Sequence, residues 1–230
     1  MSSLIACFDS FVSPWGPYTQ GAAPYLDRAI EWARITGLKV VIDLHGAPKS
    51  QNGFDHSGEK KAIPGWGDHD SVSYTLATLE VLEEKYATSE MRDVVVAIEF
   101  LNEPYLKMLD LATVKQFYSD AFYNLRKISN MTAMMHDGFY NPQWLNGFLT
   151  PQDNNAQGAI VDHHEYQIFD SGLLGMSTDQ HVALVCSSVR YALIRTALQC
   201  LLICNSRSAT TTVPINRPVS SNGYHTKDIY

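Results

Sequence analysis

Residues 38–46 read LKVVIDLHG, and such a run of β-branched and other apolar residues is typical of a strand buried on both faces. Three later segments have the same character: 94–101 (VVVAIEFL), 132–137 (TAMMHD) and 159–166 (AIVDHHEY). Apolar residues at helical spacing predict three helices, over 22–36, 70–86 and 110–128. Strands alternating with helices in this way predict βαβ units and a parallel sheet.

Polar side chains gather where each predicted strand ends. They are His45, Asn102 with Glu103, His136 with Asp137, and His164 with Tyr166. The carboxyl ends of parallel strands form the side on which α/β barrels and open α/β sheets carry their active sites. The sequence therefore predicts one site built from four strand ends.

Composition excludes several classes of protein. The 230 residues are 45% hydrophobic and 18% charged, which is typical of a folded globular domain. The net charge of -7 disfavours a nucleic acid partner, because such partners are held mainly by Lys and Arg. No apolar run approaches the length of about 18 residues that a membrane span needs. The four cysteines are too scattered for a disulfide framework, and we see no signal peptide in the first residues.

The last 60 residues differ in composition from the rest. Residues 171–230 hold five basic and two acidic side chains, while the first 170 residues have a net charge of -10, and no glutamate follows Glu165. The stripe of apolar residues over 189–204 predicts an amphipathic helix. The Ser-, Thr- and Pro-rich sequence after Asn205 predicts an unstructured end.

Glu103 is the central candidate for catalysis. A carboxylate just past a buried strand and followed by proline is fixed in direction and partly desolvated, and desolvation raises the pKa of a carboxyl group toward that of a general acid. The amide of Asn102 can donate a hydrogen bond to a substrate hydroxyl. Taken alone, Asn-Glu-Pro is also compatible with a simple loop cap. Strand alternation places His164 and Tyr166 on one face, and His163 and Glu165 on the other.

A metal site is the competing interpretation of the histidines. Possible ligands are His45, His136, His163, His164 and Asp137. Neither an H-x-H pair on a first strand nor an H-E-x-x-H helix is present, so we expect no metal and no other cofactor.

Several motifs in order resemble a known family. They are DLHGAP (43–48), SQNGFD (50–55), LNEP (101–104), HDGF (136–139) and HEYQIF (164–169). Together they resemble the fungal exo-β-1,3-glucanases of glycoside hydrolase family 5, from about residue 17 to residue 169. The resemblance implies a (β/α)8 barrel that cleaves β-glucan with retention of configuration, outside the cell or at the cell wall.

The resemblance also implies roles for individual residues. Glu103 corresponds to the general acid/base, and Asn102 to the residue that binds the sugar 2-hydroxyl. The remaining counterparts line the glycone subsite (His45, His164 and Tyr166) or grip the sugar at the pocket mouth (Phe54 and Phe169). The nucleophile of the family lies in a Gly-Glu-Trp-Ser-like segment, which has no counterpart here.

The expected fold is therefore α/β, a partial (β/α)8 barrel with about four of the eight parallel strands, the third to sixth of the family. We expect a non-matching segment 1–16, the barrel part 17–170 and an unrelated tail 171–230. Retaining hydrolysis uses two carboxyl groups, so we expect little or no hydrolysis by this chain. The alternative is a non-catalytic protein that binds β-glucan.

Overall fold

The computed structural model describes residues 2–7, 21–189, 199–204 and 210–213. This part of the chain contains one seven-stranded sheet whose strands follow one another in sequence order. The first six strands pair in parallel, and β7 is antiparallel to β6. The strands are β1 (Ser2–Cys7), β2 (Val40–Gly46), β3 (Val95–Glu99), β4 (Thr132–His136), β5 (Ala159–Glu165), β6 (Gln199–Cys204) and β7 (Thr210–Val213).

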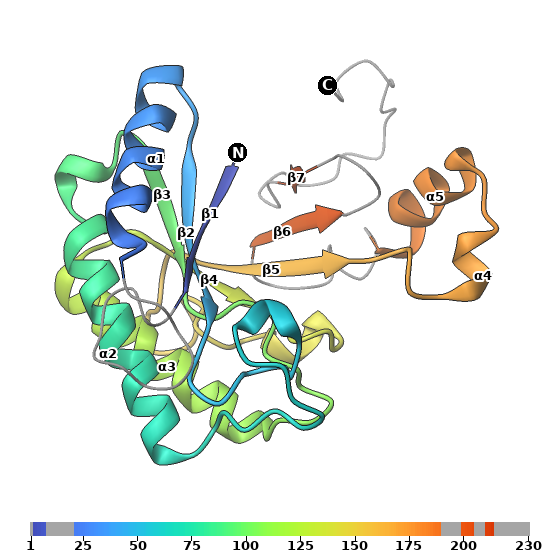
Figure 1. Cartoon of the computed structure of the whole chain (residues 1–230), viewed down its shortest axis with the longest axis horizontal. Coiled ribbons are helices and arrows are strands. Elements are labelled where there is room, and N and C mark those ends of the chain that lie inside the picture. The colour runs from blue at the N-terminus through green and yellow to red at the C-terminus, as the bar shows by residue number, and fades with distance from the viewer. Residues whose placement is uncertain (1, 8–20, 190–198, 205–209, 214–230) are drawn as a thin grey trace.

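Three long helices cover one side of the sheet, and two short helices lie beyond the end of β5 (Figure 1). The long helices are α1 (Ala23–Thr36), α2 (His69–Tyr86) and α3 (Leu111–Ile128), and the short ones are α4 (Ser171–Leu174) and α5 (Thr178–Leu184). Asp68 and Asp110 cap α2 and α3 by accepting backbone N–H groups, and Gly37 ends α1 in the left-handed conformation (φ 74°). These signals explain why the helices begin and end within two residues of their predicted bounds.

The four predicted strands are β2 to β5, and their parallel order is confirmed. The helix predicted over 189–204 is wrong for its last six residues, because Gln199–Cys204 is strand β6. Residues 190–198 lie outside the described part of the chain. The apolar run QCLLIC pairs with β5. The unpaired N–H and C=O groups at the open edge of β5 favour a strand here over the helix that local spacing predicts. The unstructured end predicted after Asn205 is likewise wrong for Thr210–Val213, which forms β7.

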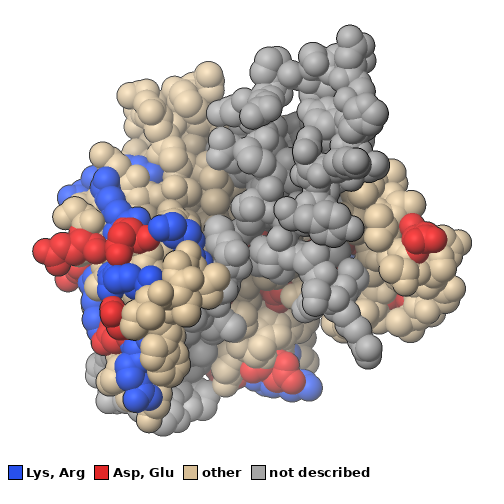
Figure 2. All heavy atoms as spheres, turned by 90° about the horizontal axis from the view of Figure 1, so that it is seen from above, with Lys and Arg blue, Asp and Glu red and all other residues tan. Residues whose placement is uncertain are grey.

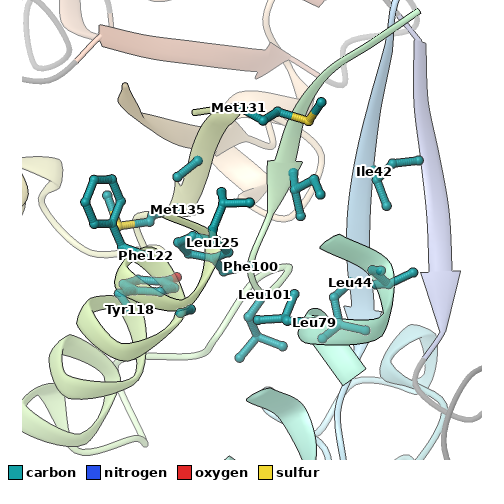
Figure 3. Close-up of a cluster of buried hydrophobic side chains, with 14 of the residues drawn as sticks. Ile42, Leu44, Leu79, Phe100, Leu101, Tyr118, Phe122, Leu125, Met131 and Met135 are labelled. Atoms are coloured by element: carbon teal, nitrogen blue, oxygen red, sulfur yellow. The ribbon is translucent and has the colours of Figure 1, made fainter. Parts of the chain in front are cut away.

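The main core lies between the sheet and the long helices. Figure 3 shows side chains meeting there from β2, α2, α3, β4 and the residues that directly follow β3 or precede β4: Ile42, Leu44, Leu79, Phe100, Leu101, Tyr118, Phe122, Leu125, Met131 and Met135. In the described part of the chain no helix combines the length and the apolar character needed to cross a membrane. The visible surface over α1 to α3 carries basic and acidic side chains mixed together (Figure 2).

The opposite face of the sheet carries the polar residues that lie beneath the site. It carries the small cluster Val41, Ala97 and Met134. Two residues further along the same strands come Asp43, Glu99 and His136, and the register pairs His136 with Asp162 on β5. All four of these polar side chains are buried. This face therefore turns from apolar to polar toward the carboxyl ends of the strands.

Candidate active site

Glu103 lies four residues beyond β3 and is only 3% exposed. Its φ of 48° is left-handed, although the residue before a proline is ordinarily extended. Backbone bonds on both sides hold this conformation: Asn102 N–H donates to the Leu44 carbonyl (3.0 Å), and Tyr105 N–H donates to the Gln51 carbonyl (3.1 Å). The carboxylate direction is therefore set by the loops after β2 and β3 together.

The buried Gln51 side chain joins these two loops. Its amide nitrogen donates to the carbonyls of His45 (2.9 Å) and Asn102 (2.8 Å), and its oxygen accepts from Ala47 N–H (3.1 Å). The loop after β4 packs against them at Gly138, where an added Cβ would lie 2.4 Å from Leu106 Cγ. No side chain at position 138 fits between these loops, so they pack closely on this side of the site.

Three side chains contact the Glu103 carboxylate. His164 Nδ1 lies 2.5 Å from Oε1, and the Tyr166 hydroxyl donates to the same oxygen at 2.8 Å. On the other oxygen, His56 Nε2 lies 3.1 Å from Oε2. His56 played no part in the predicted site, because a histidine in a polar loop carries no signal of its own.

The pKa of Glu103 differs from our prediction. Burial alone raises it, as the sequence suggested, but hydrogen bonds from His164 and His56 outweigh burial and hold the pKa well below its ordinary value. The expectation of a raised pKa is therefore wrong for the free chain. In this state Glu103 is a carboxylate, and it must gain a proton before it can act as a general acid.

His164 lies between two carboxylates. Its Nδ1 contacts Glu103, and its Nε2 lies 3.0 Å from Asp162 Oδ2. Burial lowers the pKa of this imidazole, but the bonds to Asp162 and Glu103 raise it to about 10. The pKa of Tyr166 is also raised, first by burial and then by the Glu103 charge. Both groups hold their protons at neutral pH and act as hydrogen-bond donors.

The neighbouring pair on β5 lies away from Glu103, as strand alternation requires. His163 Nδ1 lies 2.5 Å from Asp137 Oδ2, and its Nε2 lies 3.6 Å from Glu165 Oε2. Burial lowers the pKa of His163, but these two carboxylates raise it to about 9. The group stabilises the end of β5 and makes no contact with Glu103 in the described structure.

His45 and Asn102 lie beside the carboxylate. His45 Nδ1 bonds to Asp43 Oδ2 (2.8 Å), and its ring centre is 5.2 Å from that of His56. Asn102 is buried, and its Nδ2 has no hydrogen-bond partner in the described structure. A buried N–H without a partner is costly, so this amide is suited to a hydroxyl that enters the site.

Aromatic rings continue from the carboxylate toward solvent. Phe54 is 37% exposed and packs against Tyr105 and His56, with ring centres 5.5 Å apart in both cases. Phe169 is 79% exposed and lies 5.5 Å from the Tyr166 ring. Phe139 joins the two groups, 6.4 Å from Tyr105 and 6.1 Å from Tyr166. We did not predict Tyr105 or Phe139 as part of the site, because aromatic residues in loops are common in cores.

Three other carboxyl groups lie deeper on the same face: Asp43, Glu99 and Asp162. Burial and the charges of the two aspartates raise the pKa of Glu99 well above its ordinary value, which favours its protonated form. Burial also raises the pKa of Asp43, which is bonded to His45. Asp162 is completely buried behind His164. None of the three offers an accessible, charged oxygen beside Glu103.

Glu103, His136 and His164 form the one group of possible metal ligands that converges in the described residues. The group fits a metal poorly. Both His164 nitrogens bond to carboxylates, and His136 Nδ1 accepts Gly138 N–H at 2.8 Å. That acceptor leaves the proton of neutral His136 on Nε2, which therefore has no lone pair for a metal. We derive no metal chemistry from this group.

The family model of the cellulases, glycosyl hydrolase family 5, matches residues 6–192. The chain belongs to this family. The match extends beyond residues 17–169 at both ends, and the division into 1–16, 17–170 and 171–230 stays a prediction. The family assignment agrees with the motifs around His45, Glu103 and His164 in the sequence.

Two curated fungal proteins illustrate the relationship of this family 5 chain. It is 43% identical over 174 residues to a glucan 1,3-beta-glucosidase of Schwanniomyces occidentalis, and 44% identical over 175 residues to a probable glucan 1,3-beta-glucosidase A of Aspergillus terreus. Each alignment covers 75% of this chain and 40% of the relative. The chain thus spans about two fifths of the length of these proteins.

Solved structures share the fold at low sequence identity. The rutinosidase from Aspergillus niger superposes with a TM-score of 0.73 at 15% identity, covering 86% of this chain and 58% of the other. An endo-glycoceramidase II from Rhodococcus sp., in complex with a cellobiose-like isofagomine, gives a TM-score of 0.57, also at 15% identity, and covers 85% and 56%. At this identity the likeness concerns the fold alone, and it supports the partial barrel expected from the sequence.

Proposed function

We propose that the complete protein hydrolyses β-1,3-glucan from chain ends with retention of configuration, and that Glu103 is its general acid/base. The observation that carries the proposal is the buried Glu103 carboxylate at the carboxyl ends of the parallel strands, in contact with His56, His164 and Tyr166. The names of the curated relatives support the substrate. A β-glucan substrate also supports action outside the cell or at the cell wall.

The other roles follow from the surroundings of Glu103. The unpartnered Asn102 amide would bind the sugar 2-hydroxyl, and His45, His164 and Tyr166 would line the glycone subsite. Phe54 and Phe169, exposed on either side of the aromatic group, would contact the CH faces of the sugar ring at the mouth. In cleavage, Glu103 would give its proton to the glycosidic oxygen, and later take one from the attacking water.

We further propose that the 230-residue chain shows little or no hydrolysis. A retaining enzyme needs a second carboxylate about 5–5.5 Å from the acid/base as the nucleophile. No glutamate follows Glu165 in the sequence. The deeper carboxyl groups are unsuited to this role, because burial and neighbouring charges raise the pKa of Glu99 well above its ordinary value, and Asp162 is covered by His164. On this proposal the chain supplies the general acid/base, Glu103, but no nucleophilic carboxylate.

The test is incubation of the purified chain with laminarin, with released glucose as the readout and Glu103→Gln as the control. We expect the same background rate from both proteins. A rate in the usual glycosidase range, on the order of 1 to 10³ s⁻¹, that disappears in Glu103→Gln would overturn the claim of inactivity and support the site. Hydrolysis that persists in Glu103→Gln would overturn the role of Glu103.

A second candidate function is binding of β-glucan without cleavage. It is favoured by the exposed rings of Phe54 and Phe169 together with the unpartnered Asn102 amide. Trp144 is not part of this exposed pair, because it is stacked on Tyr118 with ring centres 6.4 Å apart. Calorimetric titration with laminari-oligosaccharides tests this function. Binding lost in Phe169→Ala but kept in Trp32→Ala, an exposed ring on α1, would support it.

A further inference from the structure

His56 is the only described side chain that contacts Oε2 of Glu103, and it reaches from that carboxylate to the surface. It lies in the short helix Asp55–Ser57 of the loop after β2. Its side chain is 39% exposed, whereas the side chain of Glu103 is 4% exposed. The ring thus connects a buried carboxylate with solvent.

The other two partners of Glu103 are poor proton carriers. His164 and Tyr166 both contact Oε1, so neither serves Oε2. His164 is fixed between Glu103 and Asp162 and holds its proton at neutral pH. Tyr166 keeps its phenolic proton as well. A proton that reaches Oε2 from solvent therefore has one direct donor in the described structure, which is His56.

The position of the ring suits this transfer. It lies between His45 and Phe54, with ring centres 5.2 Å and 5.5 Å away. The helix that carries it is anchored at the buried Ser57, whose hydroxyl bonds to the Phe54 carbonyl (2.7 Å). The titratable groups packed around the ring are Glu103 and His45, with Asp43 bonded behind His45.

We propose that His56 carries protons between solvent and Oε2 of Glu103. The Nε2–H bond of the imidazolium breaks as the O–H bond of Glu103 forms, which turns an ion pair into two neutral groups. The neutral ring keeps its Nδ1–H bond, and its bare Nε2 then regains a proton from water. Imidazole is the side chain that ordinarily exchanges protons with water between pH 5 and 8. The use of this proton in glycosidic cleavage rests on the proposed function, whereas the transfer itself does not.

The test is nuclear magnetic resonance of the chain without sugar, with ¹³C-labelled glutamate and histidine. In the unaltered chain, the Glu103 carboxyl carbon should show a step at the same pH midpoint as the His56 ring. In His56→Asn, whose amide keeps a donor but cannot ionise, this step should be lost, and the proton between His164 and Glu103 should exchange with water more slowly. His69→Asn, which alters an almost fully exposed histidine on α2, should leave both signals unchanged.

Two results would overturn the inference. One is a Glu103 carboxyl-carbon signal that shows no step at the pH midpoint of the His56 ring. The other is that the step and the exchange rate of the proton between His164 and Glu103 are unchanged in His56→Asn, as expected if His56 is a purely structural contact. Because no sugar is present, these outcomes are separate from those of the laminarin assay. A chain that shows the coupled titration but does not bind β-glucan would keep the inference and overturn the proposed function.

Discussion

Glu83 on α2 allows a quantitative test of the fold. This carboxyl group is completely buried, and neither of its oxygens has a hydrogen-bond partner in the described structure. Burial, aided by the charge of Glu80, raises its pKa from 4.5 to about 8. The folded chain therefore binds an extra proton between these two values, and its stability must fall as pH rises through that range.

The magnitude follows from the pKa. At pH 7 the cost of keeping Glu83 protonated is about 3 kcal/mol, from 1.36 kcal/mol for each pH unit above the ordinary pKa of 4.5. Glu83→Gln has a similar shape and needs no proton, so it should be more stable by about this amount at pH 7. The advantage should vanish near pH 4.5, where the unfolded chain is itself half protonated.

The assay is urea unfolding followed by circular dichroism at several pH values between 4.5 and 8. Glu84→Gln is the matched control, because Glu84 is the next residue on α2 and is exposed. It should change the free energy of unfolding by less than about 0.5 kcal/mol at every pH. An equal effect of the two substitutions, or a Glu83→Gln advantage that does not grow with pH, would refute the burial of Glu83 and the packing of α2 that follows from it.

Three further substitutions or conditions test the surroundings of the site. Gly138→Ala should lower the free energy of unfolding by about 1–3 kcal/mol more than Gly37→Ala does. The two glycines have similar φ values, 70° and 74°, but only the Cβ added at Gly138 would meet Leu106. Equal losses in urea unfolding would count against the close packing of these loops. Tyr118→Phe should cost about 1 kcal/mol, because its buried hydroxyl donates to the His136 carbonyl at 2.8 Å, and no loss in thermal unfolding would contradict this bond. The raised pKa of His164 contributes stability that is complete below its ordinary value of 6.5 and is lost as pH rises toward about 10; His164→Gln should flatten this alkaline loss of stability, and an unchanged slope would argue against the ion pair with Glu103 and Asp162.

The elements best predicted from sequence are those with a strong local signal. The runs 38–46 and 94–101 have a composition typical of a buried strand, and Gly37 and Asp68 mark helix ends through local backbone chemistry. The strand β6 was missed because its conformation depends on the open edge of β5, which lies far away in sequence. Local periodicity contains no information about such an edge.

The candidate site shows the same division. The strand ends that carry Glu103 and His164 could be located from periodicity, and alternation correctly put His164 and Tyr166 on one face. The direction of the Glu103 pKa could not be predicted, because burial is visible in the sequence but the hydrogen-bonding partners are not. His56 was missed for a related reason, since only the folded loop after β2 brings it to Oε2.

The absence of a usable nucleophile beside Glu103 is the central claim, and a reagent that labels such nucleophiles tests it most directly. A 2-deoxy-2-fluoroglucosyl fluoride leaves a slowly hydrolysed glycosyl ester on the carboxylate that attacks it. Intact-mass measurement after incubation with this reagent should show unmodified protein, both for the unaltered folded chain and for the Glu103→Gln variant. A glycosyl adduct that maps to Asp43, Glu99, Asp162 or any other carboxylate of the chain would contradict the account.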